Sequence, residues 1–241
     1  MKELSENEFL EILRDGVKRT MDFMAYLTDY HGGAVTTEYL LTTDIAKAFL
    51  SKGHEVRVEK LNRQIVNGLT KRKDWKPRDK IGSKRTDVAV MYSDVIPLAL
   101  VEVKISLGSA GKKVREDLAK MANVLETLDV KFAKRVRAAS VFQIHVAGKA
   151  DDIDSVRLRR EMSKKESEIL SNLKEWSTAW PEFSFSLESL MTKDEGFIPN
   201  AIETDIDGSD AIGEHGHATR YYAVFLRFKS ENREQPRKKL R

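Results

Sequence analysis

Residues 84–107, KRTDVAVMYSDVIPLALVEVKISL, carry the strongest structural signal in the chain. The first half, Arg85 to Tyr92, alternates and is rich in valine, and the second half, Leu98 to Ile105, is an apolar run interrupted by Glu102 and Lys104. Both halves are predicted to be β-strands, joined by a polar turn. Side chains alternate faces along a strand, so Glu102 and Lys104 should project together. Because buried charges are costly without a partner or a metal, we expect the functional site here.

The composition is that of an ordinary globular protein. The chain has 241 residues, of which 33% are charged and 41% hydrophobic, and its net charge is +4. This mild positive charge suits a polyanionic partner but does not require one. The absence of cysteine excludes disulfides, thiolate metal sites and cysteine nucleophiles. The N-terminus lacks the apolar core of a signal peptide, and the longest apolar run, Val95 to Val101, is too short to cross a bilayer. We therefore expect a cytoplasmic protein without a membrane partner.

The remaining chain alternates helical and strand patterns. Helices are predicted over residues 6–30, about 36–52, 112–130 and 154–176, and strands over residues 54–61, 139–147 and 221–229. Residues 181–199 look irregular, with short strand character at 183–187, and residues 200–219 look like a polar loop. This order predicts an α/β fold with a mixed central sheet and helices on both faces. We expect one domain with a core at about 36–150, an N-terminal helix, a C-terminal extension at 151–230 and a basic, disordered tail at 231–241.

The central stretch has the residue types of a divalent-cation site. Asp87, on the first strand, supplies a second carboxylate beside Glu102. Such hard oxygen ligands suit Mg²⁺, which is commonly held by one or two carboxylates together with water and substrate phosphate, with Mn²⁺ as a substitute. Lys104 is placed to hold a water molecule near phosphorus or to neutralise developing charge. Glu38, at the start of the second helix, is a candidate for an additional ligand, directly or through water.

These residues resemble a known pattern. Asp87, fourteen intervening residues and then Glu102-Val103-Lys104 resemble the PD-(D/E)XK nuclease superfamily, the restriction-endonuclease-like fold. The resemblance covers about 110 residues and implies a core of helix, three strands, helix and strand, with Mg²⁺-dependent hydrolysis of a nucleic-acid phosphodiester, usually in DNA. It matches Glu38 to the glutamate that many members carry on the first core helix. Thr86 stands where many members have a proline.

Several residues are candidates for contacts with nucleic acid. A basic segment beside the site contains Arg72, Lys73, Trp75, Lys84 and Arg85, and the helix after the motif opens with Lys112, Lys113 and Arg115. Lysine and arginine neutralise phosphates, and an aromatic ring can stack on a base. Gln143 and His145 would face the metal site if their strand neighbours the Glu102 strand, and the alternative for them is a structural hydrogen-bonding role. The alternative for the basic segment is a solvated loop.

Two other functions fit the same residues. One is a nucleic-acid-binding module that does not cleave, and the other is a protein-interaction domain in which Asp87 and Glu102 share Lys104 or Arg85 in a coincidental salt bridge. Glu38 can also be explained by the preference of helix N-termini for acidic residues. Because double-strand cleavage by this fold often uses two active sites, a homodimer or a partner subunit is a further expectation.

Overall fold

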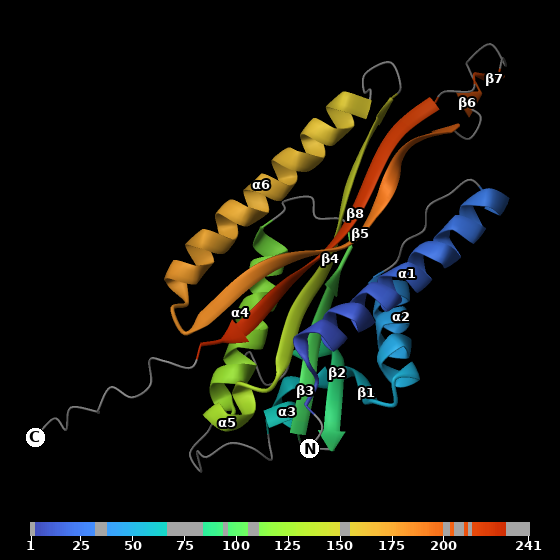
Figure 1. Ribbon diagram of the computed structural model, residues 1–241. Helices are drawn as coiled ribbons and strands as arrows, with labels where there is room; N and C mark the ends of the chain where they lie inside the picture. Colours follow the sequence, from blue (N-terminus) through green and yellow to red (C-terminus); the bar gives the residue numbers. More distant parts are fainter. Residues whose placement is uncertain are drawn as a thin grey trace, which may run out of the picture.

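The computed structural model describes residues 3–31, 38–66, 84–93, 96–105, 111–149, 155–199, 203–204, 210–211 and 214–229. Its centre is a six-stranded mixed sheet with the strand order β1-β2-β3-β4-β8-β5 (Figure 1). The strands are β1 (Glu55–Leu61), β2 (Arg85–Ser93), β3 (Ile96–Lys104), β4 (Arg137–Lys149), β5 (Phe183–Pro199) and β8 (Glu214–Phe228), with a separate short pair formed by β6 (Glu203–Thr204) and β7 (Asp210–Ala211). Strands β3 and β4 are parallel and the other neighbours are antiparallel.

Helices cover both faces of this sheet, as the sequence predicts. They are α1 (Glu6–His31), α2 (Glu38–Ser51), α3 (Asn62–Val66), α4 (Lys112–Thr127), α5 (Val130–Ala133) and α6 (Ser155–Ala179). Helices α1 and α2 pack on one face, over a core that includes Val88, Val101 and Val103. Helices α3 to α6 pack on the other face, over a core that includes Leu100 and Phe142. The two buried clusters give the molecule three layers (Figure 1).

Local signals set the ends of the first two helices. The Ser5 hydroxyl accepts a hydrogen bond from the amide of Glu8 at 3.1 Å and so caps α1. Phe9, Leu13 and Val17 follow at helical spacing and are buried against α2 and the sheet. Helix α2 ends at Ser51, and Gly53 follows it with a φ of 81°, the left-handed conformation that glycine adopts without steric cost.

The C-terminal extension differs from the sequence-based prediction. Residues 183–199 form one long strand, β5, where the sequence indicates short strand character followed by irregular chain, and β8 begins at Glu214 within the predicted loop. The second half of β5 is polar, so it lacks the apolar alternation that reveals a half-buried strand. Its pairing with β8 through Pro199 and Glu214 supplies the backbone hydrogen bonds instead.

No helix within the described ranges is both long enough and apolar enough to span a membrane.

Candidate functional site

Asp87 and Glu102 lie side by side on neighbouring antiparallel strands. Val88 of β2 pairs with Val101 of β3, which brings Asp87 opposite Glu102 on the sheet face that α4 covers. Glu102 is completely buried, and Asp87 is nearly so. The Asp87 carboxylate accepts a hydrogen bond from the Val103 amide through Oδ2 at 2.8 Å, which fixes it to β3. The two predicted carboxylates are therefore brought together.

Lys104 contacts carboxylates from both helix layers. Its Nζ donates a hydrogen bond to Glu38 Oε1 of α2 at 3.0 Å and lies 3.9 Å from Asp117 Oδ2 of α4. It also lies 3.7 Å from Asp87 Oδ2 and donates to the carbonyl of Val103 at 2.8 Å. Glu38, which is distant in sequence, thus belongs to the same cluster as Asp87 and Glu102.

Helix α4 adds two residues that the sequence reasoning missed. Lys120 donates a hydrogen bond to Glu102 Oε2 and another, at 2.8 Å, to the backbone carbonyl of Arg85. Asp117, three residues earlier and therefore on the same helix face, lies beside Lys104. A signal was present, because Asp117 falls at the helical spacing of the apolar stripe formed by Val114 and Met121.

The cluster carries more acidic than basic groups, and the pKa values reflect this. Burial, reinforced by the charge of Asp87, raises the pKa of Glu102 well above its ordinary value, although Lys120 opposes the change. Burial also raises the pKa of Asp117 to about 6. For Lys104, burial alone would lower the pKa, but Asp117, Asp87 and Glu38 together outweigh it and raise the pKa. Lys104 is therefore a fixed positive charge at neutral pH.

Three buried oxygens of this region lack a hydrogen-bond partner within the described part of the chain. They are Glu102 Oε1, Asp117 Oδ2 and Ser140 Oγ. Ser140 of β4 pairs in register with Glu102, so its side chain lies on the same sheet face. Unpaired buried oxygens cost roughly 1–3 kcal/mol each and call for a bound water or ion. Together with the excess of carboxylates, they fit a cation.

The donor set is nevertheless small. Across the described residues, no group of three or more histidine, aspartate or glutamate side chains is arranged to hold a metal ion. Asp87 and Glu102 are the two carboxylates that the sequence predicts as the main metal ligands. A cation held there would need water or substrate oxygens to complete its coordination, as is common for Mg²⁺.

The structure places Gln143 and His145 away from this cluster. Gln143 and His145 lie on the opposite face of β4, because Ser140 and Phe142 occupy the positions beside Glu102 and Lys104. The expectation that they face the site is wrong, since the register of β4 against β3 cannot be read from local sequence. His145 instead contacts the Thr219 hydroxyl at 2.9 Å.

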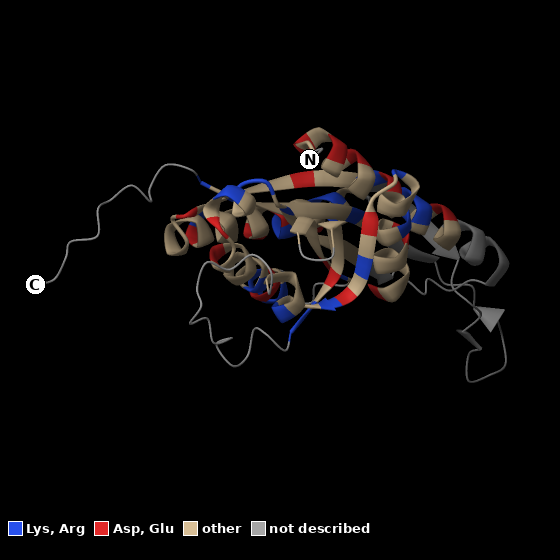
Figure 2. Cartoon of the chain, turned by 90° about the horizontal axis from the view of Figure 1, so that it is seen from below, with Lys and Arg blue, Asp and Glu red and all other residues tan. Residues whose placement is uncertain are grey.

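The predicted nucleic-acid contacts are only partly described. Lys84 and Arg85 are exposed at the start of β2, next to Asp87, and Lys112, Lys113 and Arg115 are exposed on the first turn of α4. Arg72, Lys73 and Trp75, like the tail at 231–241, lie outside the described residues. Figure 2 shows that basic and acidic positions alternate along the described helices and strands.

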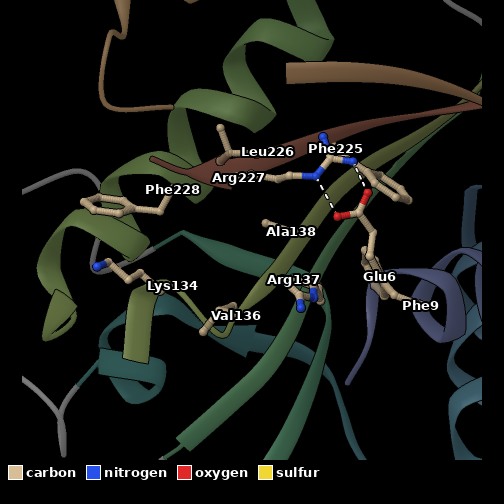
Figure 3. Close-up of a pocket in the computed structure, with 10 residues that line it drawn as sticks. All are labelled: Glu6, Phe9, Lys134, Val136, Arg137, Ala138, Phe225, Leu226, Arg227 and Phe228. Atoms are coloured by element: carbon tan, nitrogen blue, oxygen red, sulfur yellow. Dashed lines mark hydrogen bonds and ion pairs between the residues drawn. The ribbon is translucent and has the colours of Figure 1, made fainter. Parts of the chain in front are cut away.

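A separate cavity of about 160 Å³ lies near the start of α1, the start of β4 and the end of β8. Arg227 and Glu6 form an ion pair within it, and Arg137 and Lys134 lie nearby (Figure 3). The cavity shares no lining residue with the Asp87–Glu102 cluster.

Comparisons with protein-family models, with curated proteins and with solved structures gave no match for this chain. The resemblance to the PD-(D/E)XK superfamily therefore stays a prediction based on the motif.

Proposed function

We propose that this protein is a divalent-cation-dependent nuclease that hydrolyses phosphodiester bonds, with DNA as its substrate. The observation that carries the proposal is the pairing of Asp87 and Glu102 across β2 and β3, with the Lys104 ammonium 3.7 Å from Asp87. The order α2, β1, β2, β3, α4, β4, with the short helices α3 and α5 added, also follows the core order that the resemblance implies.

Asp87 and Glu102 are the residues that would hold Mg²⁺ or Mn²⁺. Glu102 offers Oε1, which is free of other partners among the described residues, and Glu38 lies within reach of the same cluster through Lys104. A divalent cation held there would supply Lewis acidity toward phosphoryl oxygens. The acidic excess of the cluster is the electrostatic reason to expect it.

Lys104 acts as a positive charge and hydrogen-bond donor. The surrounding carboxylates raise its pKa, which favours the protonated ammonium as a donor. It can orient a water molecule, or stabilise negative charge on the phosphoryl oxygens as the bond from water oxygen to phosphorus forms and the bond to the leaving oxygen breaks. Its carboxylate contacts with Glu38 and Asp117 hold it in position.

The first turn of α4 supplies a phosphate-contacting surface. Lys112, Lys113 and Arg115 are exposed there, at the N-terminal end of the helix that carries Asp117 and Lys120. The free backbone amides at a helix N-terminus favour anions, and basic side chains there add positive charge. Contacts of this kind position a nucleic acid without reading its sequence.

Cleavage assays with the purified chain test the proposal. Single- and double-stranded DNA and RNA are incubated with Mg²⁺, Mn²⁺ or EDTA, and products are resolved by size. We expect metal-dependent cleavage of DNA that falls by about a hundredfold or more in Asp87→Asn and in Lys104→Ala, which remove charges from the proposed reaction centre. Lys174→Ala, at an exposed position of α6, is the control and should keep full activity.

The same assays separate the alternatives. Salt-sensitive binding without metal-dependent cleavage would support a non-catalytic binding module. Absence of both binding and cleavage at low salt would support an interaction domain in which the charged cluster is structural. Cleavage that is equal in wild-type protein, Asp87→Asn and Lys104→Ala would show that the activity lies elsewhere or comes from a contaminant.

A further inference from the structure

Helix α4 and strand β3 are joined by two crossed charge pairs. In one pair, Lys120 of α4 contacts Glu102 of β3. In the other pair, Asp117 of α4 lies beside Lys104 of β3. Lys120 is itself largely buried, with 11% of its side chain exposed. Its second hydrogen bond reaches the Arg85 carbonyl on β2, so one ammonium group links α4 to both strands that carry the proposed ligands.

The two carboxylate oxygens of Glu102 differ in their hydrogen bonding. Lys120 occupies Oε2, whereas Oε1 is buried and has no hydrogen-bond partner in the described structure. The Ser140 hydroxyl, which has no hydrogen-bond partner among the described residues, lies on the same sheet face. A carboxylate that is held by one oxygen and leaves the other free has a fixed orientation, which is the arrangement that orients a metal ligand.

We propose that Lys120 is a positioning residue that holds Glu102 by Oε2 and presents Oε1 to a divalent cation shared with Asp87. The inference rests on the proposed function, because it assumes a cation at these two carboxylates. It assigns Lys120 no contact with the phosphodiester. Lys120 differs in this from Lys104, whose ammonium lies beside Asp87 and is placed to meet substrate.

A purely structural role for Lys120 gives different expectations. If Lys120 only anchors α4 to the sheet, its replacement lowers stability without changing cation affinity in the molecules that fold. If Lys120 instead competes with the cation for Glu102, its removal increases affinity. Cation affinity measured without nucleic acid therefore separates these roles from positioning.

The experiment measures Mn²⁺ binding to the full chain by calorimetry and by the loss of the free Mn²⁺ paramagnetic resonance signal. We expect Lys120→Met to weaken binding by about ten- to a hundredfold, as is typical when a group that orients a metal ligand is removed. Lys120→Arg, which keeps the charge and the donor, should restore affinity to within a few fold. Lys174→Met, an exposed lysine on α6, is the matched control and should bind as the wild-type chain does.

Thermal unfolding of each variant accompanies the binding measurement. If Lys120→Met does not fold, Lys120→Gln takes its place, because it keeps a hydrogen-bond donor without the charge, and it too should bind Mn²⁺ more weakly. Unchanged or tighter binding by a folded Lys120 variant overturns the positioning role alone. Absence of Mn²⁺ binding by the wild-type chain overturns the cation site itself and, with it, the role given to Lys120.

Discussion

Glu6 and Arg227 show how single residues join distant parts of the chain. The guanidinium Nε of Arg227, near the end of β8, donates to Glu6 Oε2 at 2.9 Å (Figure 3). The Nη1 of Arg227 donates to Ser186 Oγ at 2.8 Å. The hydrogen bond from Arg227 lowers the pKa of Glu6 below its ordinary value. Glu6 is the first residue of α1, so this pair fastens the N-terminal helix to the far half of the sheet.

The Glu6–Arg227 pair makes a pH-dependent contribution to stability. Because the pKa of Glu6 is lower in the folded state, the contribution is present above the unfolded pKa and is lost as the pH falls through the folded pKa. We expect Glu6→Gln to lower the free energy of unfolding by about 0.5–1 kcal/mol at pH 7, a modest value because both side chains are partly exposed. The difference should disappear at pH values below the folded pKa.

Urea unfolding of wild-type protein and Glu6→Gln across this pH range measures the effect. Glu11→Gln, an exposed position of the same helix, is the control and should stay within about 0.5 kcal/mol of wild type. A Glu6→Gln difference that is equal at neutral and acidic pH would assign the effect to packing instead of charge.

Individual site residues differed in how well the sequence reveals them. Glu102 and Lys104 are conspicuous because they interrupt an apolar strand, and Asp87 stands in an adjacent strand of the same character. Asp117 and Lys120 lie in a helix with many other charged residues, so their charge alone does not distinguish them from solvent-exposed residues. The helical spacing places Asp117 beside the apolar stripe of α4, but only the packing of α4 onto β3 shows that Lys120 reaches Glu102.

At the level of elements, the contact between α1 and α2 depends on a glycine. A Cβ atom at Gly16 would lie 2.7 Å from the backbone Cα of Ile45 on α2. The Thr20 hydroxyl, one turn later, donates to Asp44 Oδ2 of α2 at 3.0 Å, so the helices are already in close contact. Glycine at this point allows the two backbones to approach.

Gly16→Ala is therefore expected to destabilise the protein. In an exposed helix this change stabilises by about 0.5–1 kcal/mol, but here the clash with the Ile45 backbone should reverse the sign and lower the free energy of unfolding by about 1–3 kcal/mol. Chemical denaturation provides the measurement. Lys18→Ala, an exposed position on α1, should change stability by less than about 0.5 kcal/mol, and an increase in stability for Gly16→Ala would contradict the packing shown here.

The longer helices and the strands through β4 could be predicted because each has an apolar pattern of its own, whereas the short helices α3 and α5 could not, because they are too short to show a helical period. Strand β5 could not, since register irregularities at Ser189/Met191 and Lys193/Gly196 interrupt its pairing with β8 and its second half is polar. Strand order and register also cannot be read from local pattern, so the sequence could not decide between a place at the site and a structural role for Gln143 and His145.

At the level of the whole molecule, the net charge of +4 gives only weak attraction for nucleic acid, so binding should depend on where the cations lie. If Lys112 and Lys113 neutralise phosphates, the double substitution Lys112→Glu and Lys113→Glu should weaken DNA binding. It should also reduce the slope of log affinity against log salt concentration by about 2. Fluorescence anisotropy of a labelled duplex in EDTA, over a series of salt concentrations, measures both.

The control carries the same change in net charge at other places. Lys18→Glu combined with Lys174→Glu alters exposed residues of α1 and α6. This variant should keep the wild-type slope. Equal loss of slope in both double variants would show that overall charge governs binding, and not the first turn of α4.

The position of β8 also bears on how the chain is made. It is the last strand of the sheet along the sequence, yet it lies between β4 and β5. While a ribosome synthesises the chain, β4 and β5 are complete before β8 exists, so each leaves a row of backbone groups without its partner. Pairings between distant segments form slowly, and such open edges attract other chains. Closure of this sheet therefore waits until synthesis has passed Phe228, and the nascent protein should depend on chaperones until then.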